Sequence, residues 1–326
     1  MTHPTGLPQS LVFLLLSLLV ACGDDAGGGA GEGGSGGTPS LSSSLGCVDG
    51  TLDATLDHVD LEHDDRTRSY ELHVPPSYDG TTPFPLVLNF HGFTSNGPQQ
   101  RLFTQMDDTA DANDFIVAYP NGISNSWNGG VCCGQSLAND VDDVGFTRAI
   151  LEDLGTRGCV DLSRVYATGM SNGGFMSHRL ACEAADIIAA IGPVAGVLGL
   201  DAADCNPVRP VPVIHFHGTA DNIILYDGGG LTESQSVVAS TDGWAARNGC
   251  TDEPEMTFDE GMVTCETASD CDGVASVTLC TIEGGGHCWP GTPCPDLMGI
   301  DLGISTVDIN ANDAMWALFS TITLDD

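Results

Sequence analysis

The stretch V-Y-A-T-G-M-S-N-G-G, residues 165–174, decides the fold class of this chain. An apolar strand pattern over residues 164–168 runs through Gly-x-Ser-x-Gly into a helical pattern over residues 172–183. That context is typical of a nucleophile elbow, a sharp strand-to-helix turn that exposes a serine hydroxyl above a sheet. The alternative is a glycine-rich turn with an idle serine. We predict that Ser171 is a catalytic nucleophile.

Strand patterns and helix patterns alternate along most of the chain around this turn. This alternation predicts an α/β fold with a mostly parallel central sheet and helices on both faces. The site of such a fold lies at the carboxyl ends of the strands. We expect Trp316 and Phe319 to be buried by the last helix. The further expected strands are residues 69–74, 85–91, 115–119, 187–194, 211–217 and 277–282, and the further helices are residues 143–154, 241–247 and 313–319.

A serine nucleophile needs a base, and the base needs an orienting acid. In the α/β-hydrolase fold these follow the serine in the order acid, then histidine. Asp221 lies in G-T-A-D-N, just beyond an expected strand, and His287 lies in G-G-G-H-C-W-P-G, just beyond another. We therefore predict a catalytic triad of Ser171, Asp221 and His287.

Other histidines and carboxylates compete for these roles. Asp201 and Asp204 lie in an irregular loop and are the alternative acids, while Asp142-Asp143 is best interpreted as a helix N-cap. The other histidines fit the role of catalytic base less well. His215 and His217 share one face of a strand, and His178 points away from the site on a helix. Three further histidines precede the core sheet: His58, His63 and His73.

The oxyanion of an acyl-transfer reaction needs preorganised donors. We expect the backbone N–H of Asn172, and that of Phe93 in the H-G-F-T loop, with Thr94 as the alternative to Phe93. His91 could ligate a metal, but no H-x-H or H-E-x-x-H spacing accompanies it, so no metal is predicted. Trp127 and Trp289 are the expected substrate-binding residues, as an exposed aromatic shelf, although ordinary packing is an equal alternative.

The first 46 residues carry export signals. Residues 1–22 contain an apolar run, residues 11–20, that is too short to span a bilayer but suits a secretory signal. Leu19-Val20-Ala21-Cys22 resembles a bacterial lipobox, which makes Cys22 a lipidation site, although the preceding segment has no Lys or Arg. A plain cleaved signal is the alternative. Residues 23–46 are expected to be a disordered Gly/Ser-rich tether, and residues 47–326 a single catalytic domain.

The cysteines and the charge agree with a secreted, cell-envelope or extracellular protein. Of 13 cysteines, 12 remain after Cys22, which predicts up to six disulfides. We expect Cys288–Cys294 to pair, and the adjacent Cys132 and Cys133 to reach separate partners. The net charge of −36, with nine arginines and no lysine, excludes nucleic acid and anionic membrane surfaces as binding partners. Membrane contact is then expected only through the lipid anchor.

Several motifs in order resemble the polyhydroxybutyrate depolymerase and feruloyl esterase family: H-G-F, W-N-G-G-V-C-C-G, V-D-D-V-G-F, G-M-S-N-G-G-F-M, H-G-T-A-D and G-G-G-H-C-W-P-G. The resemblance covers roughly residues 68–320. It implies an α/β-hydrolase fold, carboxylic-ester hydrolysis, no cofactor and structural disulfides. It also supports Ser171, Asp221 and His287 at the matching positions.

The resemblance leaves the ester substrate open. Polymer-degrading members often carry a linker and a separate binding domain, and neither is seen in residues 47–326. We favour feruloyl or acetyl esters of plant polysaccharide, because Trp127 and Trp289 suit a flat aromatic acid and the missing binding domain argues the same way. Hydroxyalkanoate oligomers are the alternative. A peptidase, thioesterase or acyltransferase could use the same triad. The alternative of a different class is a non-catalytic surface lipoprotein that binds a ligand.

Overall fold

A computed structural model describes residues 47, 52–53, 57–294 and 301–325. The predicted signal segment, the predicted lipobox with Cys22 and the predicted tether lie outside the described residues. The compact unit that holds the described residues is Ser40–Asp326.

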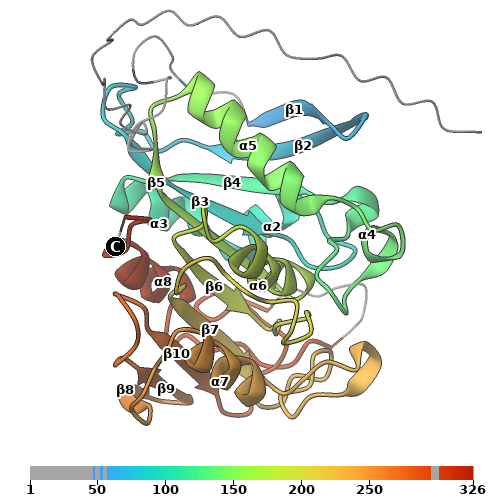
Figure 1. The fold of residues 1–326 in the computed structure, drawn as a ribbon, viewed down its shortest axis with the longest axis vertical. Helices are drawn as coiled ribbons and strands as arrows, with labels where there is room; N and C mark the ends of the chain where they lie inside the picture. The colour runs from blue at the N-terminus through green and yellow to red at the C-terminus, as the bar shows by residue number, and fades with distance from the viewer. Residues whose placement is uncertain (1–46, 48–51, 54–56, 295–300, 326) are drawn as a thin grey trace, which may run out of the picture. The chain divides into compact units, whose positions relative to one another are not determined.

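A ten-stranded sheet organises the described residues (Figure 1). Its strand order is β1-β2-β4-β3-β5-β6-β7-β10-β9-β8. The six strands from β4 to β10 in that order run parallel, and an antiparallel hairpin extends each edge. The strands are β1 (His58–His63), β2 (Arg66–His73), β3 (Phe84–Phe90), β4 (Ile116–Asn121), β5 (Val160–Met170), β6 (Ala190–Val194), β7 (Val213–Gly218), β8 (Glu255–Glu260), β9 (Val263–Ala268) and β10 (Val277–Ile282).

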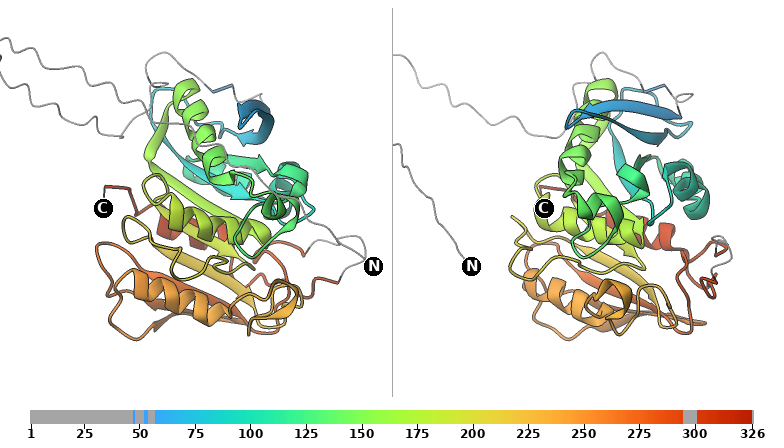
Figure 2. Two further views of the ribbon diagram at one scale, coloured as in Figure 1. Left: turned by 45° about the vertical axis from the view of Figure 1, so that its right-hand side comes forward. Right: turned by 90° about the vertical axis from the view of Figure 1, so that its right-hand side faces the viewer.

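Helices cover both faces of this sheet, as Figure 2 shows. On one face lie α5 (Asp143–Arg157), α6 (Asn172–Glu183) and α7 (Val237–Arg247). On the other lie α2 (Gly97–Thr104), α3 (Met106–Asn113) and α8 (Ala311–Phe319). A short helix, α4 (Gly134–Ala138), follows the Cys132-Cys133 loop. The predicted α/β architecture is confirmed. Within the described residues, no helix combines the length and the hydrophobicity of a membrane span.

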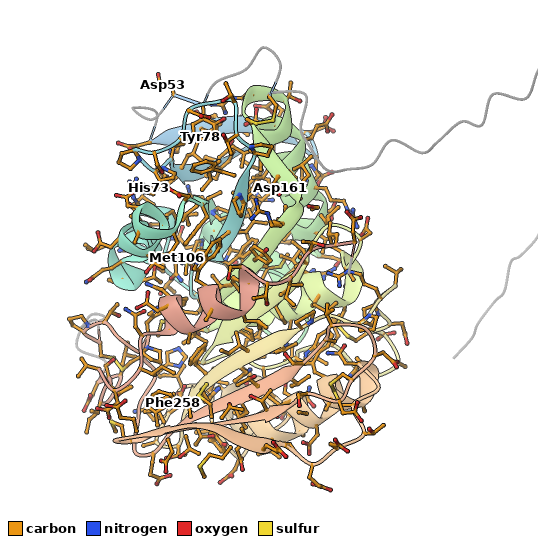
Figure 3. All side chains as sticks on the ribbon, turned by 90° about the vertical axis from the view of Figure 1, so that its left-hand side faces the viewer. Asp53, His73, Tyr78, Met106, Asp161 and Phe258 are labelled. Carbon is orange, nitrogen blue, oxygen red and sulfur yellow. A yellow bond between two sulfur atoms is a disulfide. The ribbon has the colours of Figure 1, made fainter. Side chains whose placement is uncertain are left out.

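The core forms a layer on each side of the sheet because its parallel strands are buried on both faces. Every residue of β3 is buried. Met106 of α3, which is labelled in Figure 3, belongs to the same buried cluster as Met315 and Phe319 of α8. Phe319 is buried as predicted. Trp316 was also predicted to be buried, but its side chain is only half-buried and stacks on Phe115, with ring centroids 4.3 Å apart.

The predicted elements match best where apolar periodicity was strong. Residues 172–183 and 277–282 form a helix and a strand with the predicted bounds. Residues 187–189 do not belong to the predicted strand, because the chain leaves α6 through a turn in which Ile187 and Ile188 donate to the Ala184 carbonyl. The hairpin strands β1, β8 and β9 and the short helices α2, α3 and α4 were not predicted.

Asp142 and Asp143, at the start of α5, have different partners. Asp142 caps the helix by accepting from the Gly145 N–H at 2.7 Å, which confirms the N-cap interpretation. Asp143 is fully buried and pairs with Arg68 at 2.8 Å, while its second oxygen accepts from the Asn128 N–H. Because both oxygens are engaged, Asp143 joins β2, α5 and the Trp127-Asn128 loop.

Six disulfides join all twelve cysteines of residues 47–326, which confirms the inference from their even number. Cys288–Cys294 pairs as predicted. The expectation for Cys132 and Cys133 is wrong, because these neighbours bond to each other. The other bonds are Cys47–Cys159, Cys182–Cys205, Cys250–Cys271 and Cys265–Cys280.

Candidate active site

Ser171 occupies the sharp turn between β5 and α6. Its backbone has φ 57° and ψ −119°, a conformation that L residues rarely adopt. A Cβ added to Gly173 would lie 2.0 Å from the Phe90 carbonyl oxygen, and one added to Gly169 would lie 2.6 Å from the same atom. Only glycine therefore allows β3, β5 and α6 to approach this closely, and the turn has the geometry of a nucleophile elbow.

Asp221 and His287 meet at the carboxyl edge of the sheet. Asp221 follows β7 and His287 follows β10, and these two strands are parallel neighbours. His287 Nδ1 lies 2.7 Å from Asp221 Oδ2. The other oxygen of Asp221 accepts from the N–H groups of Ile223 and Ile224 at 2.8 and 2.9 Å. The carboxylate is thereby fixed with one oxygen directed at the imidazole.

The surroundings of Asp221 favour its charged form. Burial by itself raises the pKa of this carboxyl, but hydrogen bonding from His217 and His287 lowers it more, so the pKa ends well below its usual range. Asp221 is 4% exposed and His287 is 4% exposed. A buried carboxylate that stays ionised can hold Nδ1 of the imidazole protonated and leave Nε2 free to accept a proton.

The loop that carries His287 is pinned on both sides. The His287 N–H donates to the Leu302 carbonyl at 2.6 Å, and the next residue begins the Cys288–Cys294 disulfide. Ser171 directly follows β5 at the same carboxyl edge, and β5 lies two strands from β7 in the sheet. Among the described residues, no hydrogen bond joins the Ser171 hydroxyl to His287. In free hydrolases this contact is often long and tightens only when substrate binds.

The loop after β3 passes beside the nucleophile. A Cβ placed on Gly92 would lie 3.5 Å from Ser171 Cβ. The Thr94 N–H is engaged with the Asn125 carbonyl at 2.8 Å, whereas the Phe93 N–H donates to no residue that the structure describes. Asn172 is the first residue of α6, so its N–H has no acceptor within the helix. The N–H groups of Phe93 and Asn172 therefore remain available for a ligand.

His91 braces this loop. One ring nitrogen, Nδ1, donates to the Gly92 carbonyl at 2.7 Å, and the other, Nε2, accepts from the Gly122 N–H at 3.0 Å. Burial lowers the pKa of His91 to about 4, so the ring stays neutral. Because both nitrogens are engaged, His91 is not available as a metal ligand. No cluster of three or more potential metal-binding side chains occurs among the described residues.

The predicted shelf of exposed tryptophans is wrong. Trp127 is fully buried and Trp289 is 1% exposed, because each indole N–H is used inside the protein. Trp127 donates to the His91 carbonyl at 2.9 Å, and Trp289 donates to Asn312 Oδ1 at 2.9 Å. Both tryptophans are therefore interior packing residues of the loops at the site, and neither offers an exposed ring to a ligand.

The side chain of Asn172 has a role that the motif did not reveal. Its amide accepts from the Trp127 N–H at 2.7 Å and donates to the Trp127 carbonyl at 3.0 Å. This two-point clamp fixes the W-N-G-G loop against the nucleophile turn. A buried asparagine can satisfy both backbone groups of one residue in this way, but the sequence does not say which residue it meets.

The competing residues lie elsewhere. Asp201 and Asp204 are exposed, and neither is hydrogen-bonded to His287. His178 is buried on α6 and accepts from the Trp244 indole N–H at 2.9 Å. His215 and His217 lie on one face of β7, as expected, and both are buried and hydrogen-bonded to each other. The remaining candidates lie in the hairpin at the far edge of the sheet: His58, His63 and His73.

A surface hollow of about 450 Å³ opens beside the loop after β3. The Phe93 side chain is 46% exposed and lines it. Gly134 keeps room for this ring, because a Cβ there would lie 2.5 Å from Phe93 Cε2. The hollow is also lined by polar groups of Thr94, Ser124, Asn125 and Gln135. An exposed ring among amides and hydroxyls can bind a flat, partly polar ligand.

Comparison with known proteins identifies relatives of this chain. The chain is 36% identical over 234 residues to feruloyl esterase B of Piromyces equi, which is 68% of this chain and 42% of the relative. It is 30% identical over 250 residues to NocK of Nocardia uniformis subsp. tsuyamanensis, a protein provisionally named an esterase, which is 71% of this chain and 73% of the relative. The chain thus spans less than half the length of the feruloyl esterase.

The fold is that of solved esterases. Acetyl xylan esterase from Aspergillus awamori superimposes with a TM-score of 0.55 at 15% identity, over 81% of this chain and 98% of that chain. At this identity the likeness concerns the α/β-hydrolase fold alone. Residues 68–230, which include the nucleophile turn and Asp221, match the family described as esterase PHB depolymerase. The chain therefore belongs to the polyhydroxybutyrate depolymerase family of esterases.

Proposed function

We propose that this protein is a serine carboxylic-ester hydrolase that works through Ser171, His287 and Asp221. The observation that carries the proposal is the 2.7 Å contact between His287 Nδ1 and Asp221 at the strand edge where the Ser171 turn also ends. The complete set of three residues argues against a non-catalytic surface lipoprotein, because a binding protein would not need it.

The reaction would proceed through an acyl-enzyme. His287 Nε2 takes the Ser171 proton as Oγ attacks the ester carbonyl, and the N–H groups of Phe93 and Asn172 stabilise the oxyanion. His287 then returns the proton to the leaving alcohol. Water, deprotonated by the same nitrogen, releases the acid and regenerates the serine. Asp221 remains ionised throughout and holds the imidazole in its Nδ1–H tautomer.

For the substrate, we propose feruloyl or acetyl esters of plant polysaccharide. The named activity of the Piromyces equi relative and the exposed Phe93 ring beside the oxyanion loop support an aromatic acid. Hydroxyalkanoate oligomers remain a second candidate, which the description of the matched family favours. Hydrolysis of methyl ferulate, 4-nitrophenyl acetate and hydroxybutyrate trimer, compared by kcat/KM, tests the proposal. A preference for the trimer would overturn the feruloyl assignment, and no hydrolysis of any ester would overturn the enzyme.

Replacing the exposed ring should separate these substrates. We expect Phe93→Ala to lower kcat/KM for methyl ferulate about tenfold, because ring stacking and the buried aromatic area are lost. The backbone N–H is kept, so hydrolysis of the trimer, which has no ring, should change less than about twofold. Met256→Ala, a change of an exposed residue on the edge strand β8, serves as the control. Equal losses on both substrates would show that Phe93 acts on the oxyanion loop and not on the ring of the substrate.

We also propose export and lipid anchoring. The six disulfides and the signal-like residues 1–22 support an oxidising compartment. In a bacterial host that lipidates lipoproteins, radiolabelled palmitate should enter the wild-type protein and not Cys22→Ser. Equal labelling of the two, or a mature N-terminus other than residue 22, would refute the anchor and favour a plain cleaved signal.

A further inference from the structure

Two buried histidines that the proposed reaction does not use lie behind the catalytic acid. His215 and His217 point from the same face of β7, the strand that leads to Asp221. His215 is fully buried and His217 is 1% exposed. Their rings are nearly parallel, with an interplanar angle of 7° and centroids 5.4 Å apart. Burying two imidazoles costs solvation free energy unless their ring nitrogens form hydrogen bonds inside the protein.

The proton positions on this pair follow from its partners. His217 Nε2 lies 2.8 Å from the Ile224 carbonyl oxygen, which can only accept, so Nε2 carries the hydrogen. His217 Nδ1 lies 3.1 Å from His215 Nε2. Burial lowers the pKa of His215 well below its ordinary value, so that ring is neutral. With Nε2–H donated to His217, His215 Nδ1 is a bare acceptor, and it has no partner among the described residues.

His217 is linked to Asp221 by two routes. Its Nε2–H donates to the carbonyl of Ile224, whose own N–H donates to Asp221 Oδ1. The same Nε2 lies 3.4 Å from Asp221 Oδ2, the oxygen that faces His287. The Nε2–H of His217 points mainly at the Ile224 carbonyl, which is the shorter contact. The Asp221 carboxylate is a second, weaker acceptor of the same N–H.

We propose that His217, held in its Nε2–H tautomer by His215, is a positioning residue that fixes the Asp221 loop and the charge of its carboxylate for His287. The inference rests on the proposed triad. The titratable groups around the pair are Asp221 and Tyr226 on the following loop, His178 from α6, and His287 beyond Asp221. In the proposed mechanism Asp221 stays an anion throughout, so the Nε2–H of His217 faces a negative charge in every step.

Two variants separate the hydrogen bond from the volume of the ring. His217→Phe keeps a ring but removes the Nε2–H, whereas His217→Gln can place an amide N–H near the same position. The matched control is His178→Phe, which also removes one buried hydrogen bond, that from Trp244, but has no hydrogen-bonded route to Asp221. Melting temperature, kcat, KM and the pH profile of kcat/KM would be measured for all three on 4-nitrophenyl acetate.

We expect His217→Phe to lower kcat about 10²-fold with little change in KM, because the acid loses its placement in the transition state. His217→Gln should recover at least about tenfold of that loss. The lost N–H directed its positive end towards the pair of Asp221 and His287. Its removal therefore favours the His287 imidazolium, and the acid limb of the profile should move to higher pH by roughly half a unit or more. His178→Phe should leave both kcat and the limb unchanged.

The tautomer can be checked in the wild-type protein without any variant. At neutral pH, long-range ¹H–¹⁵N spectra should show His217 protonated on Nε2 and bare on Nδ1. An imidazolium at His217, or the Nδ1–H tautomer, would overturn the inference. So would a His217→Phe enzyme with the wild-type acid limb, or a His178→Phe enzyme with an equal loss of kcat. If Asp221→Asn kept full activity, the proposed triad itself would fail, which is a separate result.

Discussion

Ser171→Ala and His287→Ala should each lower turnover of 4-nitrophenyl acetate by roughly 10⁶-fold, and the double variant should be no worse than either. Without the hydroxyl there is no nucleophile, and without the imidazole the hydroxyl is not activated. Loss of either residue therefore removes the same step. Residual hydrolysis above the uncatalysed rate would come from the oxyanion donors alone, which both variants keep.

These losses should arise without unfolding. Ser171 is only half-buried, and its unusual backbone conformation is tolerated better by a small side chain than by a large one. Circular dichroism and melting temperature should therefore change little for Ser171→Ala. An organophosphate should label the wild-type protein once, at Ser171, and leave Ser171→Ala unlabelled. Wild-type turnover by Ser171→Ala would end the interpretation of this chain as a serine esterase.

Asp221→Asn should lower kcat by about 10⁴-fold while the fold is kept. The asparagine oxygen can still accept from the N–H groups of Ile223 and Ile224. Its amide nitrogen would then face His287 Nδ1 as a donor, so the ring would have to move its own hydrogen to Nε2. In that tautomer Nε2 cannot take the serine proton, because it already carries one.

The two other aspartates serve as matched controls for this change. Asp201→Asn and Asp204→Asn remove the same charge from exposed loop positions, so kcat should stay within about twofold of the wild-type value. A large loss in either control, together with nearly full activity in Asp221→Asn, would show that the acid had been assigned to the wrong loop.

The sequence by itself determined the fold class and predicted the three residues of the proposed triad. Strand and helix periodicities are local, so the alternation around residues 165–174 predicts a parallel sheet without any knowledge of contacts. A nucleophile turn also has a local signature, because its glycines are required by close backbone approach at that very turn. Chain order and strand ends then pointed to Asp221 and His287, which the structure places 2.7 Å apart.

The even number of cysteines predicted the redox state but not the pairing. Cys288–Cys294 was accessible to sequence reasoning because only a short loop, five residues with two prolines, lies between the two. Cys132 and Cys133 were assigned wrongly because adjacent cysteines seldom bond to each other, and only the path of the loop shows that they do.

Burial and long-range partners were decided by the tertiary structure alone. Trp127 and Trp289 follow site motifs and could line a substrate shelf, yet packing turned both indoles inward to the His91 carbonyl and to Asn312. The clamp between Asn172 and Trp127 joins residues 45 positions apart, which local patterns do not connect. A side chain's type and spacing reveal what chemistry it can perform. Its exposure and its partner depend on which segments the whole chain brings together, and that is a property of the packed fold.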